Sequence, residues 1–237
     1  MSRLEICNIT KQYKKKKALD NVSCTFTEGI NTLLGANGAG KSTLMSIIST
    51  AASPTLGEVR LDGEEIISLG EKYRELMAML FQHQPYFPSV KVNEFMRYNA
   101  QLKGIPPKKI PELTEKTLQR LGVGECGSMK MKELSGGMRQ RVFLAQTIIS
   151  DPKIIILDEP SAGLDIAERA ELKGIIKELG DNAAVIISTH IVSDIEDITD
   201  RLFIIEKGRL LWSGGAGDVP KGDISGFYLK MTEREKS

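Results

Sequence analysis

The residues best suited to chemistry begin with a glycine-rich segment, GANGAGKST, at positions 35–43. The segment fits the pattern GxxxxGK[ST], in which glycines let backbone N–H groups converge on phosphate oxygens that a Cβ atom would obstruct. Lys41 supplies a positive charge for the β- and γ-phosphates of a nucleotide, and the Ser42 hydroxyl can ligate Mg²⁺. An apolar stretch precedes the segment and an amphipathic stretch follows it, as strand and helix do around a phosphate loop. We therefore predict a nucleotide phosphate site rather than a structural glycine turn.

Two adjacent carboxylates, Asp158 and Glu159, end the apolar run IIILDEP. They stand at the carboxyl end of a predicted buried strand, where open α/β sheets collect their ligands. Asp158 suits a water-mediated contact with Mg²⁺, and Glu159 suits polarisation of an attacking water. The alternative is a solvated Asp-Glu pair that starts a turn before Pro160. The phosphate loop in the same chain favours the catalytic interpretation.

A histidine follows a second apolar run, AVIISTH, and so also stands at a predicted strand end. There His190 could hydrogen-bond a γ-phosphate oxygen or the attacking water. Its position alone leaves a catalytic and a structural role equally open. The other histidine, His83, receives no role.

A second segment suited to anions, LSGGMRQR, lies at positions 134–141. Ser135 and the backbone N–H groups of Gly136 and Gly137 stand at the start of a predicted helix, an arrangement that binds anions. A serine-capped helix without a ligand is the alternative for any SGG segment. A chain with one phosphate loop thus carries a second potential phosphate-binding segment.

The elements that must position these residues indicate an α/β fold. Apolar runs without alternation are separated by helical patterns, as in parallel strands buried on both faces. These runs cover residues 30–34, 77–81, 154–157 and 184–188, and the helical patterns cover 41–51, 137–149 and 165–179. Shorter β-type runs at 4–9, 22–27 and 57–63 predict further strands, residues 88–133 a helical insertion, and residues 201–215 a hairpin turning at Lys207 and Gly208.

The composition is that of an ordinary globular protein. Of 237 residues, 41% are hydrophobic and 27% charged, and the net charge of +1 argues against bulk electrostatic binding of nucleic acid. Three cysteines without a CxxC pair suggest neither a disulfide framework nor a zinc site. The first residues, MSRLEICNIT, lack the apolar core of a signal peptide, and no window approaches the roughly 20 apolar residues of a membrane span, so we expect neither element here. If the protein works at a membrane, we expect another chain to reach it.

The four motifs GANGAGKST, LSGGMRQR, IIILDEPSAGLD and STH, in that order, resemble the nucleotide-binding domain of ABC transporters. The resemblance covers the chain from Tyr13 to about Gly214. It implies a P-loop NTPase core with a mainly parallel sheet, an N-terminal antiparallel β subdomain and an inserted α-helical subdomain. We expect a single domain over 1–237, with a core at 1–87 and 150–214, a helical subdomain with the signature motif at 88–149, and a short C-terminal tail at 215–237.

The resemblance also implies roles for the phosphate-binding residues. The Walker A loop corresponds to Gly35, Ala36, Asn37, Gly38, Ala39, Gly40, Lys41, Ser42 and Thr43. Position 36 is alanine where many relatives have proline, a change the loop should tolerate. Tyr13 corresponds to the aromatic residue that stacks on adenine, although packing at the core edge is the alternative use of such a ring.

The remaining site residues are matched in the same way. Gln82 corresponds to the Q-loop glutamine near Mg²⁺, and we choose it over Gln84 because it directly follows the apolar strand. Asp158 corresponds to the Walker B aspartate, Glu159 to the catalytic carboxylate, Asp165 to the D-loop aspartate and His190 to the switch histidine. The expected cofactors are ATP and Mg²⁺.

The resemblance finally implies partners. In these ATPases the signature loop faces the γ-phosphate on a second copy, so we expect a homodimer that also docks on integral membrane permease subunits, beside Gln82 and residues 85–92. The expected location is cytoplasmic, peripheral on the inner face of the cell membrane. The compact insertion, the signature form and the short tail resemble bacterial ABC-2 exporters of drugs, antimicrobial peptides, polysaccharides or lipids. The alternative function is a soluble assembly or scaffold ATPase, as in iron–sulfur cluster biogenesis.

Overall fold

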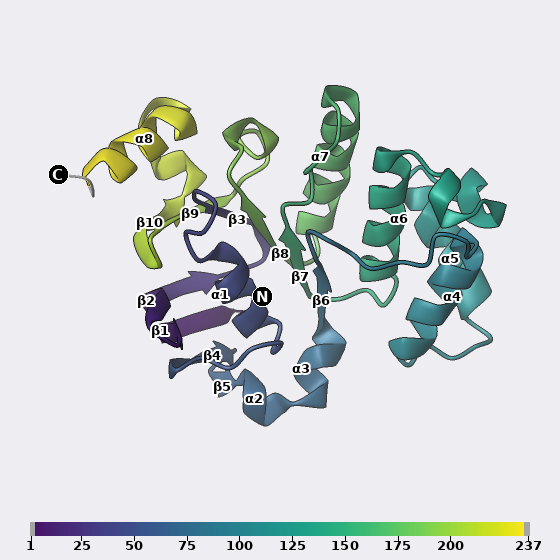
Figure 1. Ribbon diagram of the computed structural model, residues 1–237, viewed down its shortest axis with the longest axis horizontal. Coiled ribbons are helices and arrows are strands. Elements are labelled where there is room, and N and C mark those ends of the chain that lie inside the picture. Colours follow the sequence, from purple (N-terminus) through teal and green to yellow (C-terminus); the bar gives the residue numbers. More distant parts are fainter. Residues whose placement is uncertain (1–2, 235–237) are drawn as a thin grey trace.

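Two β-sheets organise the chain in the computed structural model, which describes residues 3–234 (Figure 1). The larger sheet has the strand order β10-β9-β3-β8-β7-β6, in which only the edge strand β10 runs antiparallel to its neighbour. Its strands are β3 (Gly29–Leu34), β6 (Met77–Leu80), β7 (Ile154–Asp158), β8 (Ala184–Thr189), β9 (Arg201–Glu206) and β10 (Arg209–Gly215). The predicted α/β fold with a mainly parallel sheet is confirmed.

The smaller sheet is antiparallel and has the order β2-β1-β4-β5. Its strands are β1 (Leu4–Tyr13), β2 (Lys16–Phe26), β4 (Leu56–Leu61) and β5 (Glu64–Glu65). Strands β1 and β2 are longer than the sequence predicts, because register shifts and left-handed residues at Asn8 and Asn21 interrupt their alternation. Lys14 and Lys15 form the turn between β1 and β2, and Lys16 and Lys17 begin β2.

Helices cover both faces of the larger sheet and explain why its strands lack alternation. On β7, Ile154 and Ile156 join the core beneath the smaller sheet and helix α1 (Lys41–Ile48). Ile155 and Leu157 join the core shared with α6 (Gly136–Ile148) and α7 (Ile166–Gly180). Successive strand residues point to opposite faces, so a strand covered on both sides must be apolar throughout.

The predicted helical insertion contains α4 (Val92–Leu102), α5 (Ile110–Arg120) and two 3₁₀ turns, η1 (Gly124–Ser128) and η2 (Met131–Glu133). These elements pack against α6, and the Tyr86 ring lies 5.6 Å from that of Phe143. Tyr86 is therefore a packed residue, whereas 65% of Phe87 is exposed. Two short helices, α2 (Ile66–Leu69) and α3 (Glu71–Leu76), lead into β6. The proposed subdomain boundaries stay predictions.

The end of the chain folds back on the larger sheet. After the short turns η3 (Val192–Asp194), η4 (Ala216–Asp218) and η5 (Pro220–Gly222), helix α8 (Ile224–Arg234) packs on β10. The Phe227 ring meets the Trp212 ring edge-on at 5.1 Å. Much of the expected tail at 215–237 is thus a packed helix, and its last three residues lie outside the described part. No helix among residues 3–234 has the length and apolar character needed to cross a membrane.

Two hairpin turns of the same type give a test of backbone packing. Lys207 and Gly208 have φ angles of 47° and 81°, and Asp62 and Gly63 have 51° and 88°, so both are two-residue turns of type I′. The predicted hairpin turn at Lys207 and Gly208 is confirmed. A Cβ atom on Gly208 would lie 2.7 Å from the Ala18 carbonyl oxygen, whereas one on Gly63 meets nothing within 4 Å.

We predict that Gly63→Ala lowers the free energy of unfolding by about 1–2 kcal/mol, the cost of a left-handed Cβ. Gly208→Ala should cost about 2–4 kcal/mol, because the clash with a backbone carbonyl is added. Urea denaturation of both variants measures the difference. Equal losses would contradict the close packing of the turn against β2.

Candidate functional site

A cleft of about 680 Å³ opens where the phosphate loop meets the end of β1 and the turn between β9 and β10. Its volume falls within the range of about 300–1,000 Å³ common for small-molecule sites. Among the predicted site residues, its lining contains Tyr13, Asn37, Gly38, Gly40, Lys41, Ser42, Thr43, Gln82 and Glu159. Segments far apart in the sequence therefore meet at one surface.

The same lining contains residues that the sequence did not single out. These are Lys16, Lys17, Ala18, Lys207 and Gly208. Together with Lys41, the three lysines give the cleft a basic lining suited to a polyanion. Lys17 is partly neutralised by Asp20, whose carboxylate lies 2.8 Å from the ammonium. The run of lysines at 14–17, directly after Tyr13, was the sequence feature that could have predicted this basic lining.

The phosphate loop is held open by glycine conformations. Gly38 and Gly40 have φ angles of 82° and 113°, and a Cβ atom on Gly40 would lie 2.8 Å from the Ala18 carbonyl oxygen. Helix α1 begins at Lys41, so its N-terminal N–H groups border the loop. The Lys41 ammonium folds back across the loop and donates to the carbonyl oxygens of Gly35 and Ala36 at 2.7 and 3.3 Å.

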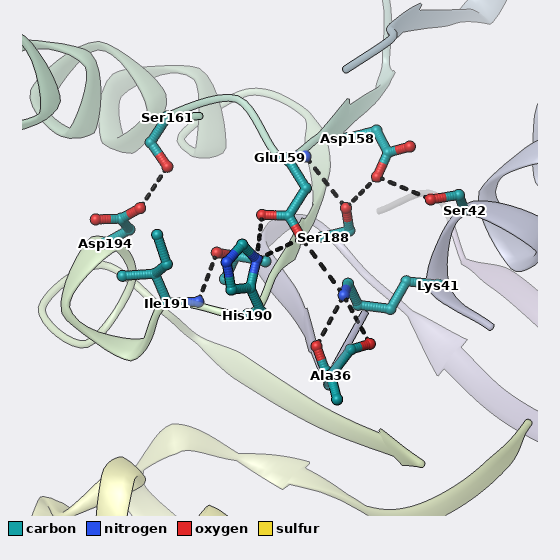
Figure 2. A network of polar contacts seen from close by, with 12 residues as sticks. Ala36, Lys41, Ser42, Asp158, Glu159, Ser161, Ser188, His190, Ile191 and Asp194 are labelled. Carbon is teal, nitrogen blue, oxygen red and sulfur yellow. Dashed lines mark hydrogen bonds and ion pairs between the residues drawn. The ribbon is translucent and has the colours of Figure 1, made fainter. Parts of the chain in front are cut away.

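Glu159 joins the phosphate loop to His190 (Figure 2). Its Oε1 lies 3.4 Å from the Lys41 ammonium, and both side chains are less than a tenth exposed. His190 Nδ1 lies 3.0 Å from each carboxylate oxygen of Glu159. Three predicted residues from three separate motifs are thus in direct contact.

A left-handed residue turns the two carboxylates to one side. Glu159 has a φ of 49°, a conformation that costs a residue with a Cβ about 1–2 kcal/mol. Two hydrogen bonds hold it, from the Glu159 N–H to the Ser188 carbonyl oxygen at 3.1 Å and to Ser188 Oγ at 3.2 Å. Ser188 Oγ in turn donates to Asp158, and Ser42 Oγ donates to the same Asp158 oxygen at 3.4 Å. The strain at Glu159 is therefore supported from the neighbouring strand.

The sequence did not identify Ser188 as part of the site. It stands two residues before His190, and the parallel register places it directly opposite Asp158. A hydroxyl at the end of a buried strand, opposite a buried carboxylate, was the signal that pointed to it.

The oxygen donors beside the loop fit Mg²⁺. Within residues 3–234, no group of three or more His, Cys, Asp or Glu side chains could hold a metal ion. The Ser42 hydroxyl and the Asp158 carboxylate are hard donors, and Mg²⁺ commonly takes one or two protein oxygens together with waters and phosphate oxygens. Gln82 lines the cleft, whereas Gln84 is not among the described lining residues and its Oε1 is buried.

The second predicted anion-binding segment lies elsewhere. Ser135, Gly136, Gly137 and Asp165 are not among the described residues that line the cleft. Ser135 caps α6 by accepting from the Met138 N–H at 3.1 Å, and Asp165 caps α7 by accepting from the Glu168 N–H at 2.9 Å. A hydrogen bond links the signature segment with the residues around Glu159. Gln140 of α6 donates to the Pro160 carbonyl oxygen at 2.8 Å, next to Glu159.

Helix α8 brings the Tyr228 hydroxyl near the phosphate loop, a proximity that the sequence left unassigned. Burial raises the pKa of this hydroxyl above its ordinary value, and the Glu206 carboxylate raises it further. The backbone of Ala36 acts in the opposite direction and lowers this pKa.

We predict that Ser188→Ala lowers the free energy of unfolding by about 1–3 kcal/mol, because it leaves buried Asp158 short of a donor. Urea denaturation measures the loss. Ser23→Ala is the matched control, since its exposed hydroxyl accepts from the Asn8 N–H at 2.8 Å. A loss at Ser188 no larger than that at Ser23 would contradict the bridging role.

Comparisons with known proteins identify similar chains. The family model described as ABC transporter matches residues 19–162. The uncharacterized ABC transporter ATP-binding protein YxlF of Bacillus subtilis is 34% identical, over 98% of this chain and 77% of its own. The methionine import ATP-binding protein MetN of Haemophilus influenzae is 32% identical, over 97% of this chain and 70% of its own.

Two further matches are a drug-resistance protein and a solved structure. The daunorubicin resistance ATP-binding protein DrrA3 of Streptomyces coeruleorubidus is 28% identical, over 95% of this chain and 72% of its own. A bacterial ABC transporter cassette, described as a dimeric structure, superposes with a TM-score of 0.79 at 24% identity, over 90% of this chain and 98% of its own. The last match supports the fold.

Proposed function

This chain belongs to the ABC transporter family of ATP-binding domains, whose members are ATPases, and we propose that it binds and hydrolyses ATP to drive a separate membrane permease. The observation that carries the proposal is the contact of Glu159 with both Lys41 and His190, beside a basic cleft that Lys41 and Glu159 line. A phosphate loop, a buried carboxylate and a histidine are brought together there from three motifs.

Nucleotide binding is proposed to use the whole cleft. Tyr13 is 49% exposed at the cleft and presents a ring for the adenine base. Its ring already has the Lys11 ammonium 5.0 Å from its centroid. The N–H groups at the start of α1 point toward the phosphates, and Lys41 exchanges its carbonyl acceptors for phosphate oxygens. When bound through Ser42 and Asp158, Mg²⁺ would neutralise phosphate charge.

Hydrolysis is proposed to depend on Glu159. Its carboxylate can accept a hydrogen bond from the attacking water and polarise it. A carboxylate only accepts hydrogen bonds, so His190 holds it by donating from Nδ1, and the neutral ring then keeps Nε2 as an acceptor. The two residues act as one unit that orients water against the γ-phosphate.

The signature segment is proposed to complete the site on a second copy. Ser135, Gly136 and Gly137 lie outside the cleft that holds this chain's own phosphate loop. A two-fold pair, head to tail, gives each of two nucleotides one phosphate loop and one signature segment. A cassette with the same fold is described as a dimeric structure, which supports the pairing of two copies.

The permease and the direction of transport are further parts of the proposal. We propose that the chain lies on the cytoplasmic face of the membrane, docked on permease subunits beside Gln82 and residues 85–92. Relatives include a methionine import protein and a daunorubicin resistance protein. The form of the signature and the compact insertion favour export, with drugs, antimicrobial peptides, polysaccharides or lipids as substrate classes.

Native purification tests the permease proposal. A protein with several membrane spans should co-purify with the chain from detergent-solubilised membranes, and vesicles containing both should move substrate only with ATP. Recovery in a soluble complex without a membrane subunit would instead support an assembly ATPase.

We predict that Glu159→Gln lowers kcat for ATP hydrolysis by about 10²–10⁴-fold, because water activation is lost while the phosphate contacts remain. ATP binding should persist, and the variant should accumulate as a dimer with ATP. Steady-state kinetics and size-exclusion chromatography measure the two effects. Hydrolysis at the wild-type rate would remove Glu159 from its role.

We predict that Ser135→Arg leaves ATP binding to the monomer within about twofold of wild type, yet abolishes dimer-dependent hydrolysis, because the new side chain fills the place of the partner's phosphate. Ser128→Arg, at an exposed position of the same helical region, is the control. Fluorescence titration and ATPase assays separate the effects. Equal loss of binding and hydrolysis would contradict action on a second copy.

A further inference from the structure

Glu168 of α7 occupies the signature segment within the same chain. Its Oε1 accepts from the Gly137 N–H at 2.9 Å and from Ser135 Oγ at 3.4 Å. Its Oε2 accepts from the Asp165 N–H at 3.3 Å, which closes a capping box at the start of α7. One carboxylate therefore serves the N-terminal ends of two helices.

The fit is close. A Cβ atom built on Gly137 would lie only 2.3 Å from Glu168 Oε1, so the carboxylate rests directly against the backbone at this glycine. A phosphate oxygen that used the Gly137 N–H would have to take the same position. Carboxylates and phosphates bind helix N-termini for the same reason, since both are anionic acceptors.

We propose that Glu168 is a resident competitor for the γ-phosphate of the partner's ATP. It must release Gly137 and Ser135 before two chains can close on nucleotide, and it thereby raises the ATP concentration that closure requires. This inference rests on the proposed function, because it takes the signature segment as the binding site for a second copy's phosphate.

The structure provides for the release. Glu168 Oε2 can remain on the Asp165 N–H while Oε1 leaves Gly137, so α7 keeps its cap. A second link between the same helices, the ion pair of Arg141 and Glu171 at 2.9 Å, does not involve the signature N–H groups. Loss of the Glu168 contact therefore leaves α6 and α7 connected.

The test uses the Glu159→Gln protein, which we expect to bind ATP without hydrolysing it at an appreciable rate. Dimer formation is followed by light scattering against ATP concentration, with Glu168→Gln or Glu171→Gln added. Glutamine keeps the length and an acceptor oxygen but removes the charge, and hydrogen bonds to charged groups are roughly twice as strong as neutral ones. We expect Glu168→Gln to lower the half-maximal ATP concentration about 3- to 10-fold, and Glu171→Gln to leave it within about twofold.

A purely structural role predicts the opposite direction. If Glu168 only caps helices, its replacement should lower the melting temperature and also weaken the dimer. Glu168→Asp, which keeps the charge but shortens the reach to Gly137, should favour dimerisation as Glu168→Gln does. This second variant keeps the test decisive if one of them folds poorly.

The outcomes are separable. In one outcome, the Glu159→Gln protein dimerises with ATP, but adding Glu168→Gln gives a half-maximal ATP concentration equal to or higher than that with Glu171→Gln. This outcome would overturn the competitor role of Glu168 and leave the proposed dimer intact. A Glu159→Gln protein that stays monomeric at every ATP concentration would overturn the proposed dimer and, with it, the role of Glu168.

Discussion

The parallel register of β3, β8 and β7 is the constraint on which the site depends. It sets Leu34 beside Thr189 and Asp158 beside Ser188, so the three strands end at the same edge of the sheet. The phosphate loop, the two carboxylates and His190 all follow those ends. A slip of one residue in this register would turn every side chain of the strand to the other face, which the two buried cores forbid. Burial on both faces thus fixes the geometry of the site.

Buried charge makes the contacts at this edge interdependent. Lys41 and Glu159 are both almost fully buried, and removal of either partner would leave the other charge without compensation. Glu159 also holds a left-handed backbone, supported by Ser188, which bonds to Asp158 as well. Strained residues that persist because their surroundings hold them are typical of functional sites. In the proposed function, this support keeps the carboxylate directed at the cleft.

The two anion-binding segments differ in what faces them. The phosphate loop borders an open basic cleft, and its lysine bonds to the loop's own carbonyl groups. In the signature segment, the Glu168 carboxylate already accepts from the Gly137 N–H and the Ser135 hydroxyl. In the proposed function, such a chain binds nucleotide at its phosphate loop, while Glu168 opposes binding of a second copy's phosphate at the signature segment. Gln140 of α6 connects the two segments by donating to the Pro160 carbonyl oxygen, next to Glu159.

The sequence by itself determined the fold class and the motif chemistry. Each of the two motifs is a short continuous segment: GANGAGKST directly follows its strand β3, and IIILDEP contains its strand β7 and the two carboxylates. A local sequence pattern is therefore enough to identify them. Tertiary structure alone decided which side chains complete them. Ser188 and Glu168 bond to partners 30 and 31 residues away. Lys207 lines a cleft together with segments far from it in the sequence, and the Tyr228 hydroxyl lies near Ala36. Such contacts follow from strand register and helix packing, which join segments that are distant in the sequence. They produce no periodic pattern within either segment, so the sequence of one segment does not reveal its partner.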